Sequence, residues 1–101
     1  MTNFTPRPVN SNGMSLAAYV EGVEMGVLVD RFNEGFMEGY VDDEKGYDGA
    51  EVGFVHNETG LELYAYARYG SVRVGCRRDE RTDADDIARE LAQFLRSSAS
   101  N

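Results

Sequence analysis

Apolar and polar side chains alternate along the second half of the chain. Three runs show this pattern, at residues 50–55, 61–68 and 72–77. A period of two with one apolar face is typical of an antiparallel sheet that is covered on one side. The apolar positions are Ala50, Val52, Phe54, Leu61, Leu63, Ala65, Ala67, Val72, Val74 and Cys76. The sequence therefore predicts strands with one buried face and one open face.

The period changes near the end of the chain. Apolar residues fall on one helical stripe formed by Ala84, Ile87, Ala88, Leu91, Phe94 and Leu95. Thr82 followed by Asp85 resembles a capping box, and Arg96 stands where the helix dipole favours a cation. We expect a C-terminal helix that packs on the buried face of the sheet.

Glycine-containing turns separate these elements. Residues 56–61 read as a hairpin connection that Gly60 closes in a left-handed conformation, and residues 43–46 repeat that chemistry. Glu21-Gly22 and Tyr69-Gly70 are predicted tight turns.

Residues 27–41 allow two interpretations. Leu28, Phe32, Phe36 and Tyr40 are spaced four apart, as on one face of a helix. Glycines and β-branched valines in the same stretch oppose a helix, because a glycine costs about 1 kcal/mol in a helix interior. The balance favours strands.

Together these patterns predict an α+β fold, an antiparallel β-meander of five or six strands with one C-terminal α-helix packed on one face. A length of 101 residues fits one domain. We expect a flexible N-terminal arm at 1–13, a single α+β domain at 14–96 and a disordered tail at 97–101, because both ends are turn-forming and lack an apolar period.

Charge excludes several classes of function. The net charge of −8 opposes binding to nucleic acid, where a protein must replace phosphate counterions, and to anionic membranes. Apolar runs are too short to span a bilayer, and the first residues lack a signal-peptide pattern. A single cysteine, Cys76, suits a reducing compartment, so we expect a cytoplasmic protein.

The acidity is concentrated in part of the chain. Twelve acidic and only two basic side chains lie between Ala18 and Ala67. From Arg68 to the end there are seven arginines and six acids. The first two thirds of the domain therefore carry the negative charge.

We find no catalytic or cofactor motif. His56 and Cys76 have no neighbouring residues that would form a nucleophilic dyad or triad, so we interpret them as a turn-flanking residue and a small buried hydrophobe. Residues 42–48 are rich in oxygen ligands but fail the calcium-loop spacing, which favours a solvated acidic turn. We expect no catalytic residue, no cofactor and no bound metal.

A basic stretch allows two interpretations. Its members are Arg68, Arg73, Arg77, Arg78 and Arg81. Alternation places Arg68, Arg73 and Arg77 on the face away from the core, where they could bind an anion or RNA beside tyrosines. We favour pairing with acids on neighbouring strands.

Tyrosines stand among the acids, and this combination predicts a protein-binding face. Tyrosine offers rigid amphipathic contact area, and spaced carboxylates resemble a phosphate backbone. The candidate partner-binding residues are Glu34, Glu38, Tyr40, Asp42, Asp43, Glu44, Tyr47, Asp48, Tyr64 and Tyr66.

These features favour a non-enzymatic inhibitor that binds a protein partner, including a nucleic-acid-binding complex. Small acidic anti-defence proteins of phages and mobile elements, of the anti-CRISPR or DNA-mimic type, offer an analogy of size and charge. The alternative is a structural or adaptor subunit, either an immunity-type protein or a homodimer built through the tyrosine face. An enzyme or small-molecule binder is the third hypothesis and has the least support.

Overall fold

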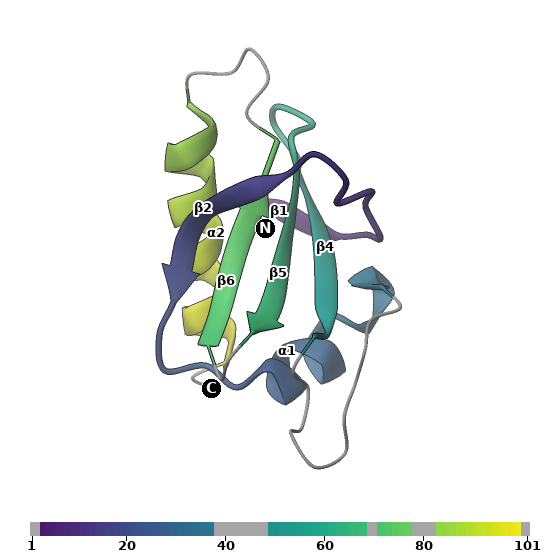
Figure 1. Ribbon diagram of the computed structural model, residues 1–101, viewed down its shortest axis with the longest axis vertical. Coiled ribbons are helices and arrows are strands. Elements are labelled where there is room, and N and C mark those ends of the chain that lie inside the picture. The colour runs from purple at the N-terminus through teal and green to yellow at the C-terminus, as the bar shows by residue number, and fades with distance from the viewer. Residues whose placement is uncertain (1–2, 38–48, 69–70, 78–82, 100–101) are drawn as a thin grey trace.

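A computed structural model describes residues 3–37, 49–68, 71–77 and 83–99 (Figure 1). A six-stranded antiparallel sheet and one long C-terminal helix form the fold, which confirms the predicted α+β class. The elements are β1 (Phe4–Pro6), β2 (Ser15–Val20), α1 (Met25–Arg31), the 3-10 helix η1 (Asn33–Gly35), β3 (Phe36–Met37), β4 (Glu51–His56), β5 (Glu62–Arg68), β6 (Ser71–Cys76) and α2 (Ala84–Ala99).

The strand order is β1-β4-β5-β6-β2, and β3 also pairs with β4. Consecutive hairpins join β4, β5 and β6 into a meander, while β2 pairs with β6 at one edge. At the other edge, β1 pairs with residues 54–56 of β4 and β3 with residues 51–52. Gly60 has a φ of 78° in the β4–β5 connection, the left-handed conformation that its sequence predicts.

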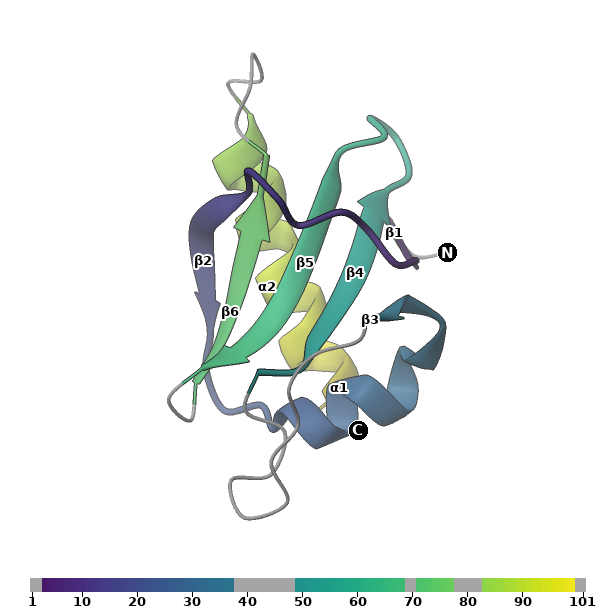
Figure 2. The same cartoon turned by 45° about the vertical axis from the view of Figure 1, so that its right-hand side comes forward.

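Helix α2 covers one face of the sheet (Figure 2). Alternation along β4, β5 and β6 directs Phe54, Leu63 and Val74 into this layer, where each is fully buried. The facing stripe of α2 buries Ala84, Ile87, Ala88, Leu91, Ala92 and Leu95. The expected packing of the helix on the apolar sheet face is therefore confirmed.

The prediction of strands within residues 27–41 is wrong for most of the residues that the structure describes there. Residues 25–31 form α1, residues 33–35 form η1, and only Phe36–Met37 pair as a strand, while 38–41 lie outside the described residues. Of the residues spaced four apart, Leu28 lies in α1, where it is buried with Met25 and Val29, while Phe32 ends the helix and Phe36 lies in β3. Burial of this stripe outweighs the weak helix propensity of glycine and valine.

The expected flexible arm at 1–13 is also corrected over its described part. Phe4 is 1% exposed, and its ring lies 5.2 Å from His56 and 5.7 Å from Phe94. Residues 7–14 then cross the sheet on the side opposite α2 (Figure 2), and we call this segment the strap. A single buried phenylalanine carries little periodic signal, which is why the pattern missed β1.

At the opposite end, α2 continues to Ala99, so residues 97–99 of the expected tail are helical. No helix among the described residues is long and apolar enough to cross a membrane.

The strap depends on a glycine in the centre of β4. A Cβ at Gly53 would lie 2.3 Å from Arg7 O and 2.9 Å from Val9 N, and Arg7 N donates to Gly53 O at 2.9 Å. We expect Gly53→Ala to force the strap away from the sheet and to lower the free energy of unfolding by about 1–3 kcal/mol, the range for overpacking. Urea denaturation measures this change.

The matched control is Gly60→Ala, whose added Cβ meets no atom within 4 Å but must adopt a positive φ. It reports backbone strain alone, about 1 kcal/mol. If the two variants lose the same free energy of unfolding, Gly53 does not provide the space in which the strap packs.

Candidate binding face

The side of the sheet opposite α2 carries large side chains on its three central strands and on β2. We call this surface the open face. Alternation and the strand register place on it Tyr19, Glu51, Glu62, Tyr64, Tyr66, Arg68, Arg73 and Arg77. The strap crosses this face at the end where β6 finishes.

A stacked pair of tyrosines forms the centre of the open face. Tyr64 and Tyr66 stand two residues apart on β5, with ring centroids 4.9 Å apart and planes inclined by 21°. Tyr64 lies over Gly75 of the neighbouring strand, where a Cβ would come within 2.4 Å of Cε1. The glycine therefore provides the space that lets the Tyr64 ring lie flat on β6.

Arg73 of β6 lies next to this pair and links it to β2. Arg73 is the cross-strand partner of both Tyr66 and Tyr19, and its guanidinium carbon lies 5.5 Å from the centroid of the Tyr19 ring. Its Nε donates to Ser71 Oγ at 3.3 Å. Tyr19 is 59% exposed, so the row from β5 to β2 ends in an accessible aromatic ring.

Arg77 holds the strap in place. Its Nη1 donates to Asn12 O and its Nη2 to Asn10 O, each at 3.0 Å. The strap also contacts β3, because Val9 N donates to the sulfur of Met37 at 3.4 Å. Together these bonds satisfy two carbonyl groups and one amide group of a segment that has no regular secondary structure.

The contacts of Arg73 and Arg77 differ from the favoured expectation for the basic stretch. The structure shows them with an aromatic ring, a hydroxyl and backbone carbonyls, and not with acids on neighbouring strands. For Arg73, strand order explains the difference, because its cross-strand partners are Tyr66 and Tyr19. Arg77 follows the Leu63–Cys76 pair and lies next to Glu62 of β5, yet it donates to the strap carbonyls. Arg78 and Arg81 lie outside the described residues.

Two ionisable groups of the open face have shifted pKa values. Burial raises the pKa of Glu51 above its ordinary value of 4.5. The pKa of Tyr64 is raised by burial and further by the neighbouring Tyr66 and Glu51, while Arg68 acts in the opposite direction. Both shifts favour the neutral forms, so Tyr64 is a hydrogen-bonding phenol and not an activated base or nucleophile.

The structure describes three of the ten predicted partner-binding residues. Tyr64 and Tyr66 lie together on the open face, as the alternation predicts. Glu34 is exposed in η1, at the β4 edge of the sheet and apart from the tyrosine pair. Glu38, Tyr40, Asp42, Asp43, Glu44, Tyr47 and Asp48 lie outside the described residues, as does the acidic turn at 42–48.

Sequence reasoning placed Arg73 on the face away from the core, beside the tyrosines, but missed Tyr19 as its neighbour. The available signal was the short alternation of Ala18, Tyr19 and Val20, which indicates that the tyrosine faces away from the core. The proximity of Tyr19 to Arg73 depends on β2 returning to pair with β6, across more than fifty residues of chain. Alternation predicts a face but not the strand that lies beside it.

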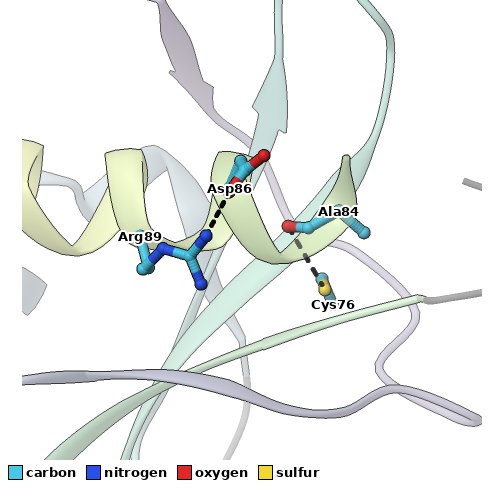
Figure 3. Close-up of polar contacts among 4 residues, drawn as sticks. All are labelled: Cys76, Ala84, Asp86 and Arg89. Atoms are coloured by element: carbon cyan, nitrogen blue, oxygen red, sulfur yellow. Dashed lines mark hydrogen bonds and ion pairs between the residues drawn. The ribbon is translucent and has the colours of Figure 1, made fainter. Parts of the chain in front are cut away.

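His56 and Cys76 have structural roles. His56 is 5% exposed, and its Nδ1 is 2.7 Å from Thr59 Oγ1 in the hairpin connection. Cys76 is fully buried, and its thiol donates to the carbonyl of Ala84 at 3.9 Å (Figure 3). The two residues stand on β4 and β6 with β5 between them. Among the described residues no three His, Cys, Asp or Glu side chains gather to hold a metal ion.

The shifted pKa of Glu51 makes stability depend on pH. Because the pKa is raised in the folded state, stability is lost as the pH rises through the folded pKa. We expect Glu51→Gln to be more stable than the natural protein at neutral pH and equally stable below pH 4.5. Urea denaturation at the two pH values measures the difference.

Glu58→Gln is the control, since it removes the same charge from an exposed position in the β4–β5 connection. It separates the effect of net charge from the effect of burial. An identical pH profile for the two variants would contradict desolvation as the cause at Glu51.

Comparison with family models, with curated proteins and with solved structures finds no match to this chain. The functional interpretation therefore depends on the chemistry of its own residues.

Proposed function

We propose that this protein is a non-enzymatic inhibitor that binds a partner protein through the open face. The observation that carries the proposal is the stacked Tyr64–Tyr66 pair, continued by Arg73 and Tyr19, on a sheet face that α2 does not cover. Tyrosine and arginine are enriched at the energetically dominant positions of protein interfaces.

Preorganisation supports this role. Stacking and the close fit of Tyr64 over Gly75 limit the motion of the rings before any partner arrives. A side chain that is already ordered loses less entropy on binding, which otherwise costs about 0.5–1.5 kcal/mol for each immobilised side chain. The open face therefore resembles the rigid aromatic contact surface of a binder more than the concave site of an enzyme.

The protonation of the open face supports a binding role over catalysis. The neutral phenol of Tyr64 can donate and accept hydrogen bonds, and the raised pKa of Glu51 lowers the cost of burying it further in an interface. His56 and Cys76 are buried in structural contacts. The described residues thus offer contact area and hydrogen bonds in place of an activated nucleophile.

The acids contribute charge to the proposed interaction. The net charge of −8 complements a basic surface and accelerates encounter with it. We extend the proposal to a cytoplasmic partner that itself binds nucleic acid, as in anti-defence proteins of the anti-CRISPR or DNA-mimic type. In this division of roles, carboxylates guide approach and the tyrosines supply the close contacts.

Removal of the Tyr66 ring tests whether the tyrosine pair contacts the partner. We expect Tyr66→Ala to weaken capture of the partner from the native host at least about tenfold, the loss typical of an interface residue worth more than 1.4 kcal/mol. Quantitative affinity capture with purified, tagged protein measures the loss. Val27→Ala, which truncates an exposed apolar residue of α1, is the control. Equal capture by all three proteins would overturn the proposal.

Charge reversal tests the role of the acids separately. We expect the combined change Asp42→Lys, Asp43→Lys and Glu44→Lys to slow association and to reduce the dependence of binding on salt. Capture at low and high salt measures both effects. If the reversed protein binds as the natural one does at every salt concentration, the nucleic-acid-mimic part of the proposal fails, while the role of the tyrosines stands.

A further inference from the structure

The two edges of the sheet are protected unequally. One edge is formed by β1, which has three residues and ends at Pro6, and by the two-residue β3. Short strands and proline are devices that prevent a sheet from pairing with another chain. The other edge, β2, has six residues and contains neither charge nor proline, so its one protective device is the irregularity in its register against β6 between Leu16 and Ala18. Among the described strands, only β6 pairs with β2.

A groove follows this less protected edge. It lies between β2 and α2, has a volume of about 310 Å³, and is lined from β2 by residues 17–21 and from α2 by Arg89, Ala92, Gln93 and Arg96. Three of the lining residues, Ala17, Ala18 and Ala92, are small and apolar. Tyr19, the most exposed large apolar side chain of the described residues, stands at its rim.

Charge along this flank of α2 changes sign from one end to the other. Asp85 and Asp86 lie in the first turn, and Asp86 pairs with Arg89 one turn later (Figure 3). Arg96 lies in the last turn. Such a flank is complementary to a copy of itself that runs in the opposite direction, and antiparallel helix dipoles add to the attraction.

We propose that a second copy of this chain binds here, with its β2 antiparallel to β2 and a two-fold axis perpendicular to the sheet. This arrangement is isologous, as most homodimer interfaces are. It joins the two sheets into one and places the two α2 helices side by side on the same face. The inference is independent of the proposed inhibitor function.

Charge sets the register of this pairing. In the two-fold arrangement the two α2 helices are antiparallel, so the last turn of one lies beside the first turn of the other. We place the axis near Ala18, the register in which Arg96 comes beside Asp85 and Asp86 of the second copy and not beside Arg89, a like charge.

Both open faces then point to the same side of the joined sheet. The dimer would present two tyrosine surfaces to a partner, which increases avidity if both can engage.

Sedimentation equilibrium of the full chain tests the proposal. We expect a mass near twice 11.2 kDa for the natural protein at high concentration. Arg96→Asp should weaken dimerisation at least about tenfold, because it places like charges together twice in each dimer. Asp86→Arg should weaken it similarly, and the double variant should recover most of the natural affinity.

The double variant separates a lost contact from a damaged fold, since it carries both unfavourable helix-end charges and yet restores the cross-copy pair. Arg68→Asp, on the open face, is the matched charge control and should dimerise normally. Hydrogen exchange provides a second readout, in which the amides of Ser15–Val20 become protected as the protein concentration rises.

Three results would overturn the proposal. The first is a monomeric mass at every concentration. The second is a dimer that the double variant fails to restore. The third is a dimer that dissociates on Tyr66→Ala and not on Arg96→Asp, which would place the contact on the open face instead.

Discussion

The packing of α2 on the β4–β6 meander is the interaction on which the other features depend. Three short strands cannot bury their apolar face by themselves, and α2 covers it with a stripe that includes the fully buried Leu91 and Leu95. Because the helix occupies one side, every second residue of each strand is left on the other. The tyrosines and arginines of the open face are among these residues on the side away from α2.

A second constraint lies where three chain segments meet on β4. The strap crosses at Gly53, and the turn before β3 brings Gly35 against the same strand, where a Cβ would lie 2.4 Å from Gly53 O. Two glycines thus allow β1, β3 and the strap to share one edge of the sheet. This arrangement closes that edge and leaves β2 as the less protected one, so the asymmetry of the sheet follows from local sterics.

The open face and the β2 edge serve different kinds of contact. On the open face, stacking and a cation–π contact hold aromatic rings before binding, which suits recognition of a different protein. Along β2, an edge strand without charge or proline and a helix flank with opposite charges at its ends suit a copy of the same chain. Tyr19 borders both regions, because β2 carries the outer ring of one and the pairing strand of the other.

Residue patterns alone predict the strands between residues 50 and 77, the C-terminal helix and the outward direction of Tyr64 and Tyr66. These features follow from local periodicity, since alternation or a 3.6-residue stripe can be read within one element. The return of β2 beside β6, the contact of Arg73 with Tyr19 and the helix at residues 25–31 emerge only in the folded chain. Each of these depends on contacts between distant segments, where burial outweighs local propensity and no short pattern encodes the partner.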